Sequence, residues 1–281
     1  MIVDSHLHLF RHGYGHFGPR ISPLGKLSDV DAYESVRRHH NIAAGLVVCY
    51  EDQDIDPRNN TYVRSLAADR PWIHSVAYLR PTPSPTRQHI ESFIEAGHCG
   101  IALYLPDEAA AAAVLQWPAE IWRLLSEVDA IISLNAPPEA TMHLRPLIER
   151  SETCAFIFSH LGLPGRHDPA PTQSFAAERL GPLLDLASLP NVGVKLSGLY
   201  AIDPRPPHLA AQPFIELLLE RFDSAALHWG SDFSPALEFV QFEQTLRLSK
   251  LAELTDADRA LILGDGLLAK LRRTEYGNPL S

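Results

Sequence analysis

The chain has 281 residues, 46% of them hydrophobic, and it carries a formal net charge of −10 at pH 7. Its length suits one (β/α)8 barrel, which needs about 250 residues, and its acidity disfavours binding to nucleic acids or anionic membranes. No apolar run approaches the roughly 18 residues of a membrane span, and the opening MIVDSHLHLF lacks the basic and apolar regions of a secretory signal. We therefore expect a cytoplasmic protein that acts on a small-molecule substrate, with no nucleic-acid or membrane partner.

Eight short runs along the chain have the character of buried strands. In chain order they are Met1–Ser5, Ala44–Cys49, Trp72–Tyr78, Gly100–Leu105, Ala130–Leu134, Ala155–Ser159, Val192–Ser197 and Ala226–Gly230. Most consist of Val, Ile, Leu and Ala without alternation, which is typical of strands buried on both faces of a parallel sheet.

Stretches of helical character lie between these runs. They are Val30–His40, Asn59–Asp69, Pro85–Ala96, Pro118–Glu127, Pro138–Arg150, Ala176–Ala187, Gln212–Phe222 and Asp256–Arg273. The first is preceded by Asp29, which we expect to be its N-cap. Strands that alternate with helices predict an α/β fold, and no GxGxxG follows the first strand as it would in a dinucleotide-binding sheet. We therefore predict a (β/α)8 TIM barrel in which residues 1–281 form a single domain.

The segment Asp4-Ser5-His6-Leu7-His8 ends the first expected strand. Residues i and i+2 of a strand share a face, so His6 and His8 should point together into the barrel mouth, with Asp4 one step deeper on that side. Two converging imidazoles suit a metal ion or an anionic centre.

Two further polar residues follow later strands. His160 comes after strand six in Ser159-His160-Leu161-Gly162, and Asp232 comes after strand eight in Gly230-Ser231-Asp232-Phe233. Because a closed barrel brings strand eight beside strand one, Asp232 should lie near the histidines. A carboxylate there can bind a metal, accept a proton from water, or both.

Four motifs in the chain follow the same order as in a known family: DSHLH at residues 4–8, SHLGLP at 159–164, VKLSGL at 194–199 and WGSDF at 229–233. From Ile2 to about Arg272 the chain resembles the amidohydrolase-related branch of the amidohydrolase superfamily. That branch is similar to 2-pyrone-4,6-dicarboxylate lactonase and the sugar-acid lactonases. The resemblance implies a hydrolase that opens a lactone or a related cyclic ester.

The resemblance also implies roles for individual residues. His6 and His8 are the strand-one pair, His160 is the strand-six histidine and Asp232 is the strand-eight acid. Asp232 would activate water, with His160 as its partner. Lys195, in the strand-seven motif, would be a cation near the barrel mouth suited to a carboxylate or an oxyanion, or a lysine that reaches solvent from the strand end.

Three departures from the family pattern bear on function. Asn135 stands where many metal-binding relatives carry a strand-five histidine. Gly100-Ile101-Ala102 lacks the strand-four arginine that could hold a substrate carboxylate, which puts a dicarboxylate substrate in doubt. Gly264-Asp265-Gly266-Leu267 replaces the usual Asn-Ala near the C-terminal helix.

Other functions remain open at this point. A metal-dependent decarboxylase of an unsaturated or aromatic acid would share this barrel, although Asn135 argues against it. A lactone isomerase is a further alternative. A barrel that only binds a ligand is disfavoured, because a convergent set of three histidines and an aspartate is costly to keep for packing alone.

The sequence offers evidence both for and against a bound metal. His6, His8 and Asp232 could supply the three protein ligands of a catalytic zinc, with His160 as a fourth ligand or orienting the water. Against this, the amide of Asn135 is a poor substitute for imidazole. A lactone is an activated ester, so a metal-free site is the alternative. We expect one zinc rather than two, because strand four offers no lysine or carboxylate to bridge a pair.

Two long loops should form walls of the site, since loops after barrel strands lie on the catalytic face. They are Leu9–Ser28 after strand one and Gly198–Ala211 after strand seven. We expect substrate to contact aromatic, amide and cationic side chains in these loops and at the ends of strands two, four and five, namely Tyr14, Phe17, Arg20, Tyr50, Tyr104, Asn135, Tyr200 and Arg205. A homodimer is a further expectation, because barrels of this size often pair.

Overall fold

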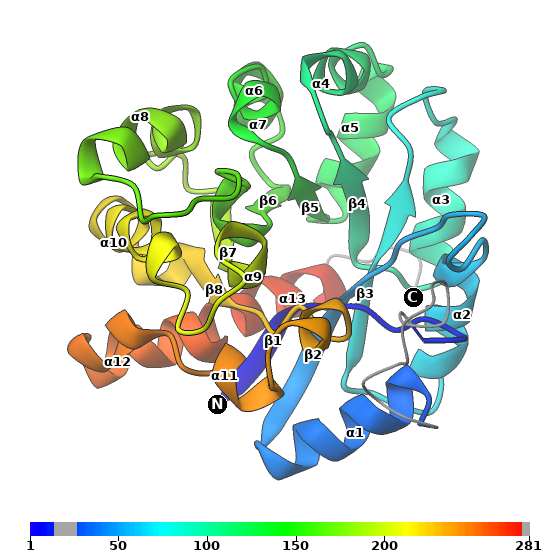
Figure 1. The fold of residues 1–281 in the computed structure, drawn as a ribbon. Helices are drawn as coiled ribbons and strands as arrows, with labels where there is room; N and C mark the ends of the chain where they lie inside the picture. Colours follow the sequence, from blue (N-terminus) through cyan, green and yellow to red (C-terminus); the bar gives the residue numbers. More distant parts are fainter. Residues whose placement is uncertain (14–26, 277–281) are drawn as a thin grey trace.

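The computed structural model describes residues 1–13 and 27–276. In this part of the chain eight parallel strands form one sheet in which every strand pairs with the next along the sequence (Figure 1). The strands are β1 (Ile2–Leu7), β2 (Ile42–Val48), β3 (Ile73–Leu79), β4 (Gly100–Tyr104), β5 (Ile131–Asn135), β6 (Ala155–Phe158), β7 (Val192–Leu196) and β8 (Leu227–Trp229). This order confirms the predicted (β/α)8 barrel.

The sheet closes between β1 and the segment that follows β8. Leu7 and Phe233 form a parallel bridge, and the backbone N–H of Asp232 donates to the carbonyl of His6 at 2.8 Å. The closure brings the strand-one histidines beside the strand-eight acid, as expected for a barrel.

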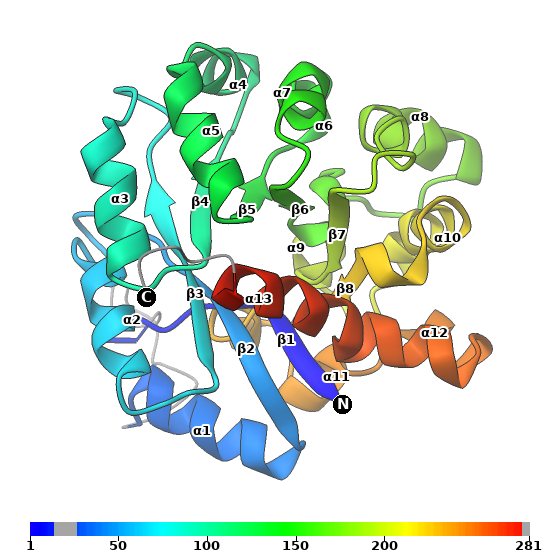
Figure 2. The ribbon, with the colours of Figure 1, turned by 180° about the vertical axis from the view of Figure 1, so that it is seen from behind.

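Helices surround the barrel and cover one of its ends (Figure 2). They are α1 (Asp29–His39), α2 (Asn59–Ala67), α3 (Arg87–Glu95), α4 (Glu108–Leu115), α5 (Ala119–Glu127), α6 (Pro138–Thr141), α7 (Arg145–Arg150), α8 (Gln173–Leu184), α9 (Leu199–Ile202), α10 (Gln212–Arg221), α11 (Phe242–Thr245), α12 (Asp256–Ala260) and α13 (Gly266–Tyr276). Leu267 and Leu271 of α13 pack with Val3 in the barrel interior, so α13 closes the amino-terminal end. The described helices include none that is both long and apolar enough to span a bilayer.

Three helical details differ from the sequence expectation. Helix α1 is capped by Ser28, whose side chain accepts from the N–H of Asp31, while the Asp29 carboxylate instead accepts from the N–H of Phe10. Helix α4 was not expected, because its sequence, EAAAAAVL, has no apolar stripe. The expected helices at 138–150 and 256–273 are each interrupted, the second by a π-helical turn at Leu261–Asp265.

Inward-facing side chains change from apolar to polar along the strands. On β5 the buried Ile131 is followed two residues later by Ser133, and on β6 Ile157 is followed by Ser159. Side chains two residues apart on a strand share a face, so the apolar interior ends partway up the barrel. The polar residues therefore gather at the carboxyl ends of the strands, where barrel active sites lie.

Candidate active site

A register shift in β1 decides which side chains of the first motif face inward. Asp4 pairs with Gly45 and Leu7 pairs with Val47, so three steps along β1 match two along β2. An extra residue of this kind reverses the alternation of side chains beyond it. Asp4 and His6 therefore face opposite sides of the sheet, although they are two residues apart.

Asp4 consequently does not line the barrel mouth, and the expectation that it lies on the side of His6 is corrected. Its carboxylate accepts hydrogen bonds from the Tyr33 hydroxyl at 2.8 Å, from the Ser231 hydroxyl, and from the backbone N–H groups of Ser231 and His6 at 2.9 and 3.1 Å. Burial raises the pKa of Asp4 to about 6, although these hydrogen bonds lower it. Asp4 thus ties β1 to α1 and to the segment that carries Asp232.

His6 and His8 do converge as predicted. Their Nε2 atoms lie 3.1 Å apart, and both side chains are buried. The carboxylate of Asp232 lies opposite them, with Oδ1 at 3.6 Å from each Nε2. Three ligand atoms from β1 and from the end of β8 therefore surround one point.

This triangle fits a metal ion. Zinc bonds nitrogen and oxygen ligands at about 2.0–2.1 Å, which places neighbouring ligands of a tetrahedral site about 3.3 Å apart. The observed separations of 3.1, 3.6 and 3.6 Å bracket that value. His6, His8 and Asp232 are also a buried set whose ligand atoms all lie within 4.8 Å of one another. The donor set, two imidazoles and one carboxylate, suits a single zinc with an open position.

The outer nitrogens of both imidazoles have partners that orient the rings. Nδ1 of His8 lies 2.7 Å from the carbonyl oxygen of Val48, to which it donates, so the lone pair of Nε2 faces the other two ligand atoms. Nδ1 of His6 lies 3.3 Å from the hydroxyl of Ser159 and 3.2 Å from Nζ of Lys195.

Lys195 lies inside the barrel and not at its rim. Its side chain is fully buried, and Nζ donates to the hydroxyl of Ser133 at 2.7 Å as well as contacting His6. Burial lowers the pKa of Lys195 to about 7, although Asp232 and Asp4 raise it. The burial of Lys195 corrects the interpretation as a lysine that reaches solvent, whereas its role as a cation near the mouth stays a prediction. Lys195 contacts Nδ1 of His6, the ring nitrogen on the side away from His8 and Asp232.

His160 completes the group of ionisable side chains. Its ring centroid lies 4.6 Å from that of His6, and its Nδ1 lies 3.0 Å from the hydroxyl of Ser197 and 3.9 Å from Oδ2 of Asp232. The chain must approach closely here, because a Cβ on Gly198 would lie only 2.2 Å from Nδ1 of His160. Gly198 also has a φ of +62°, a conformation that glycine adopts at little cost.

The backbone is strained at two of these five ionisable residues. His160 has a φ of +54° and Asp232 a φ of +55°, in the left-handed region that residues with a side chain rarely occupy. Each such residue costs on the order of 1–3 kcal/mol and persists only where its surroundings enforce it. Both strained residues follow strands at the mouth, and backbone strain of this kind is common at active sites.

The protonation states suit base catalysis at neutral pH. Burial, together with Lys195 and the other histidines, holds the pKa of His6 well below its ordinary value, and burial and Lys195 also lower that of His160. Burial alone would raise the pKa of Asp232, but His160, His8 and the Tyr200 hydroxyl outweigh it, and the pKa lies below its ordinary value. Asp232 is therefore ionised at neutral pH, and the imidazole of His6 beside it is neutral.

Tyrosines form the opposite part of the mouth. Tyr50 follows β2, Tyr78 lies in β3 and Tyr104 ends β4, and their ring centroids are 5.0–5.6 Å apart. Tyr50 and Tyr104 were expected to face substrate. Tyr78 was missed, although its place at the end of β3, between the other two strands, could have indicated it.

The other residues predicted to contact substrate lie in different surroundings. Tyr200, on α9, donates its hydroxyl to Oδ2 of Asp232 at 2.7 Å. Asn135 ends β5 on the same face as Ser133. Arg205 pairs with the carboxylates of Asp168 and Asp203, and its side chain is 64% exposed. Tyr14, Phe17 and Arg20 lie outside the described residues.

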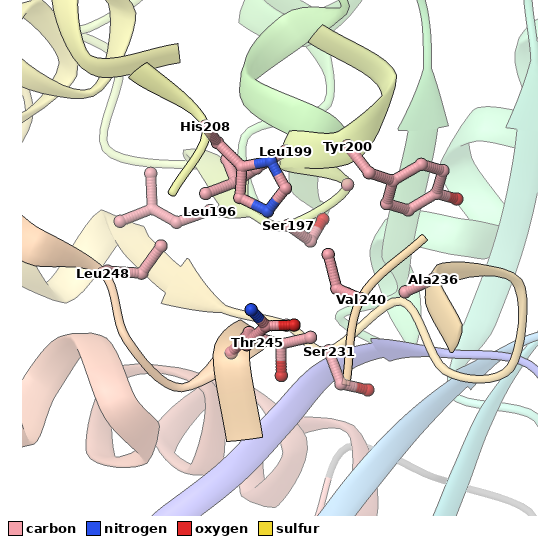
Figure 3. Close-up of a pocket in the computed structure, with 13 residues that line it drawn as sticks. Leu196, Ser197, Leu199, Tyr200, His208, Ser231, Ala236, Val240, Thr245 and Leu248 are labelled. Atoms are coloured by element: carbon pink, nitrogen blue, oxygen red, sulfur yellow. The ribbon is translucent and has the colours of Figure 1, made fainter. Parts of the chain in front are cut away.

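Two cavities flank the ionisable group and the tyrosines. A small one of about 20 Å³ lies between the ends of β7 and β8 and α11, and Tyr200, Ser197 and Ser231 line it (Figure 3). It is about large enough for one water, so it cannot be the substrate pocket. An open groove of about 970 Å³ runs between α2 and α3 and reaches Tyr78.

Comparison with known proteins gives a family match and several structural ones. Residues 3–265 match the family model described as amidohydrolase. An amidohydrolase from Burkholderia multivorans with bound zinc is 22% identical, with 97% of this chain and 99% of that chain covered and a TM-score of 0.77. A "probable 2-pyrone-4,6-dicarboxylic acid hydrolase" from Acinetobacter baumannii with bound citric acid is 18% identical, covers 96% and 99%, and has a TM-score of 0.72. No curated protein matches the chain.

Proposed function

The chain belongs to the amidohydrolase family, and on that premise we propose that it is a hydrolase that opens a lactone or a related cyclic ester. The observation that carries the proposal is the convergence of His6, His8 and Asp232 on one point at the mouth of the barrel, with His160 beside them. An ionised carboxylate next to an electrophilic centre can serve as the general base of ester hydrolysis.

We propose that His6, His8 and Asp232 hold one divalent metal, and that this metal is zinc. The separations of the ligand atoms and the orientation of His8 by Val48 support this, and a structural relative contains zinc. When bound, zinc would polarise the lactone carbonyl and make water more acidic. Asn135 at the end of β5 leaves the site with three protein ligands, the number typical of catalytic zinc.

The side chains of the protein account for the proton transfers. Asp232 accepts a proton from the attacking water, for which its lowered pKa keeps it ionised at neutral pH. The hydroxide adds to the carbonyl carbon, and the ring C–O bond then breaks. The proton held by Asp232 passes to the departing ring oxygen, so that lactone and water give a hydroxy acid. Nδ1 of His160 contacts the Ser197 hydroxyl, and we propose that Nε2 interacts with the carbonyl oxygen of the substrate.

The tyrosines are proposed to contact the rest of the substrate. Tyr50, Tyr78 and Tyr104 present aromatic faces and hydroxyl groups, which suit a ring that carries hydroxyl or apolar substituents. Ala102, where some relatives have arginine, is fully buried in the barrel interior, so β4 offers no cation to a substrate carboxylate. A dicarboxylate such as the one named for the Acinetobacter relative is therefore not the substrate that we propose.

The test is a panel of γ- and δ-lactones, with and without carboxylate substituents, assayed for acid release at neutral pH. We expect turnover of at least one uncharged lactone by the wild type and none by Asp232→Asn. The Asp203→Asn variant is a matched control, because Asp203 is a buried aspartate outside the site whose loss should leave turnover in place. If no lactone in the panel is turned over, or if Asp232→Asn is as active as the wild type, the proposed function is wrong.

A further inference from the structure

The two oxygens of the Asp232 carboxylate face different partners. Oδ1 lies 3.6 Å from Nε2 of His6 and from Nε2 of His8, in the position of a metal ligand. Oδ2 accepts a hydrogen bond from the Tyr200 hydroxyl at 2.7 Å, and Nδ1 of His160 lies 3.9 Å from it. The orientation of the carboxylate therefore depends on a hydrogen bond made on the side away from the two strand-one histidines.

Tyr200 is itself held in place by its neighbours. It lies on the short helix α9, and its ring stacks on Phe239 with centroids 4.7 Å apart and an interplanar angle of 11°. Figure 3 shows the ring extending away from His208 and Leu248, on the far side of the small cavity. Because two segments from different parts of the chain meet at this stack, the hydroxyl reaches Oδ2 from a fixed direction.

From this geometry we infer that Tyr200 is a positioning residue for Asp232 and not a group that binds substrate. Its hydroxyl fixes the carboxylate so that Oδ1 faces the two imidazoles, and Phe239 fixes Tyr200. The inference rests on the proposed metal site. It separates Tyr200 from Tyr50 and Tyr104, with which the sequence grouped it, because those rings contact other tyrosines.

A positioning role and a substrate-binding role of Tyr200 predict different changes in zinc affinity, kcat and KM when its hydroxyl is removed. Outer partners of metal ligands typically change metal affinity or activity by about 10–100-fold when removed. If Tyr200 positions Asp232, loss of its hydroxyl weakens zinc binding and lowers kcat while KM changes little. If Tyr200 binds substrate, the same change raises KM and leaves zinc affinity unaltered.

The experiment compares wild type, Tyr200→Phe, Phe239→Leu and the control Tyr62→Phe. Zinc affinity is measured by competition with a chromophoric chelator, and kcat and KM are measured on a lactone that the wild type hydrolyses. Tyr62 is a suitable control because its ring lies under Arg11, outside the site, and the variant also loses one phenol hydroxyl. Thermal unfolding of each variant checks that the fold is retained.

We expect Tyr200→Phe to weaken zinc binding about 10–100-fold and to lower kcat with KM within about twofold. Phe239→Leu, which keeps the hydroxyl but removes the stacked ring, should weaken zinc binding by a smaller factor, about 2–10-fold. Tyr62→Phe should match the wild type. Wild-type zinc affinity in Tyr200→Phe, or a wild type that binds no zinc, would overturn the inference. If the wild type binds zinc but hydrolyses no lactone, the proposed function fails and the zinc comparison still decides the role of Tyr200.

Discussion

The mouth of the barrel has two halves that are built differently. The polar half consists of His6, His8, His160 and Asp232, from β1, β6 and β8. The tyrosine half consists of Tyr50, Tyr78 and Tyr104, from β2, β3 and β4. Each member of the polar half has a defined hydrogen-bond partner behind it, whereas the rings of the tyrosine half contact one another, and Tyr78 and Tyr104 also pack against the hydrophobic core.

The backbone shows the same contrast. His160 and Asp232 have left-handed φ angles, while Tyr78 and Tyr104 lie in regular strands. A group that transfers protons or binds a metal must be held within a fraction of an ångström, which justifies strain and outer partners. A surface that selects a ring by shape needs neither. From this contrast we propose that the barrel separates chemistry, in the polar half, from substrate selection, in the tyrosine half.

The largest effect should follow from removing the base of the polar half. Asp232→Asn keeps the shape of the side chain but cannot take a proton at neutral pH. We expect kcat to fall by about 10²–10⁴-fold, measured as acid release from the best lactone of the panel. A Tyr50→Phe variant assayed in parallel should retain most of kcat. Comparable losses in the two variants would break the comparison, since selection and chemistry would then share one half.

Asp4, whose buried carboxylate contacts the backbone of the polar half, should make the free energy of unfolding depend on pH. The pKa of Asp4 is raised by burial from 3.8 to about 6, so its contribution to stability is fully present below the unfolded pKa and is lost as the pH rises through 6. Asp4→Asn cannot ionise, and its free energy of unfolding relative to wild type should therefore rise by about 2 kcal/mol between pH 4 and pH 7. Urea unfolding of metal-free protein at both pH values measures this. Tyr50→Phe should show no such change, and a constant difference for Asp4→Asn would contradict the account.

A substitution at Gly198 tests how precisely His160 must be positioned in the polar half. A Cβ at this position would lie 2.2 Å from Nδ1 of His160, and φ is +62°. Gly198→Ala should therefore displace His160, lower kcat by about 10²-fold, and destabilise the fold by about 1–2 kcal/mol. Gly165→Ala is the control, because Gly165 also has a positive φ but a Cβ there would contact nothing within 4 Å. Equal activity of the two variants would show that His160 need not be held in place.

The smallest effect should come from the tyrosine half. Tyr50→Leu removes a half-buried ring and should raise KM about 10-fold with kcat nearly unchanged, because one lost apolar contact is worth about 1–3 kcal/mol in binding. The change in KM should also differ among lactones with different ring substituents. A fall in kcat at constant KM would instead assign Tyr50 to the chemistry.

The polar half was easier to predict from the sequence than the tyrosine half. His6, His8, His160 and Asp232 each stand in a short motif at a strand end, and the closed barrel leaves one place for them to meet. Asp4 was misplaced because a β-bulge breaks the two-residue period, and no residue type in β1 marks the bulge. The burial of Lys195 could not be predicted because its partner Ser133 is distant in sequence.

The fold was predicted almost completely, because local sequence patterns indicate most of its strands and helices. Runs of β-branched and aliphatic residues mark most of the strands, and each strand pairs with the next one along the sequence. Helix α4 was missed because five consecutive alanines between Glu108 and Val114 carry no amphipathic pattern. The pairing of Tyr200 with Asp232 depends on where the loop after β7 turns, which side-chain patterns do not determine. The predicted homodimer and cytoplasmic location stay predictions.

The central claim is that His6, His8 and Asp232 form a one-zinc hydrolytic site. The most direct measurement is the zinc content of protein purified without chelator, together with lactone hydrolysis before chelation, after chelation and after zinc is restored. The account predicts one zinc per chain, loss of hydrolysis on chelation and its return with zinc, and little zinc in His8→Ala. Full hydrolysis by metal-free protein would contradict the claim and would leave Asp232 and the histidines to act without a metal.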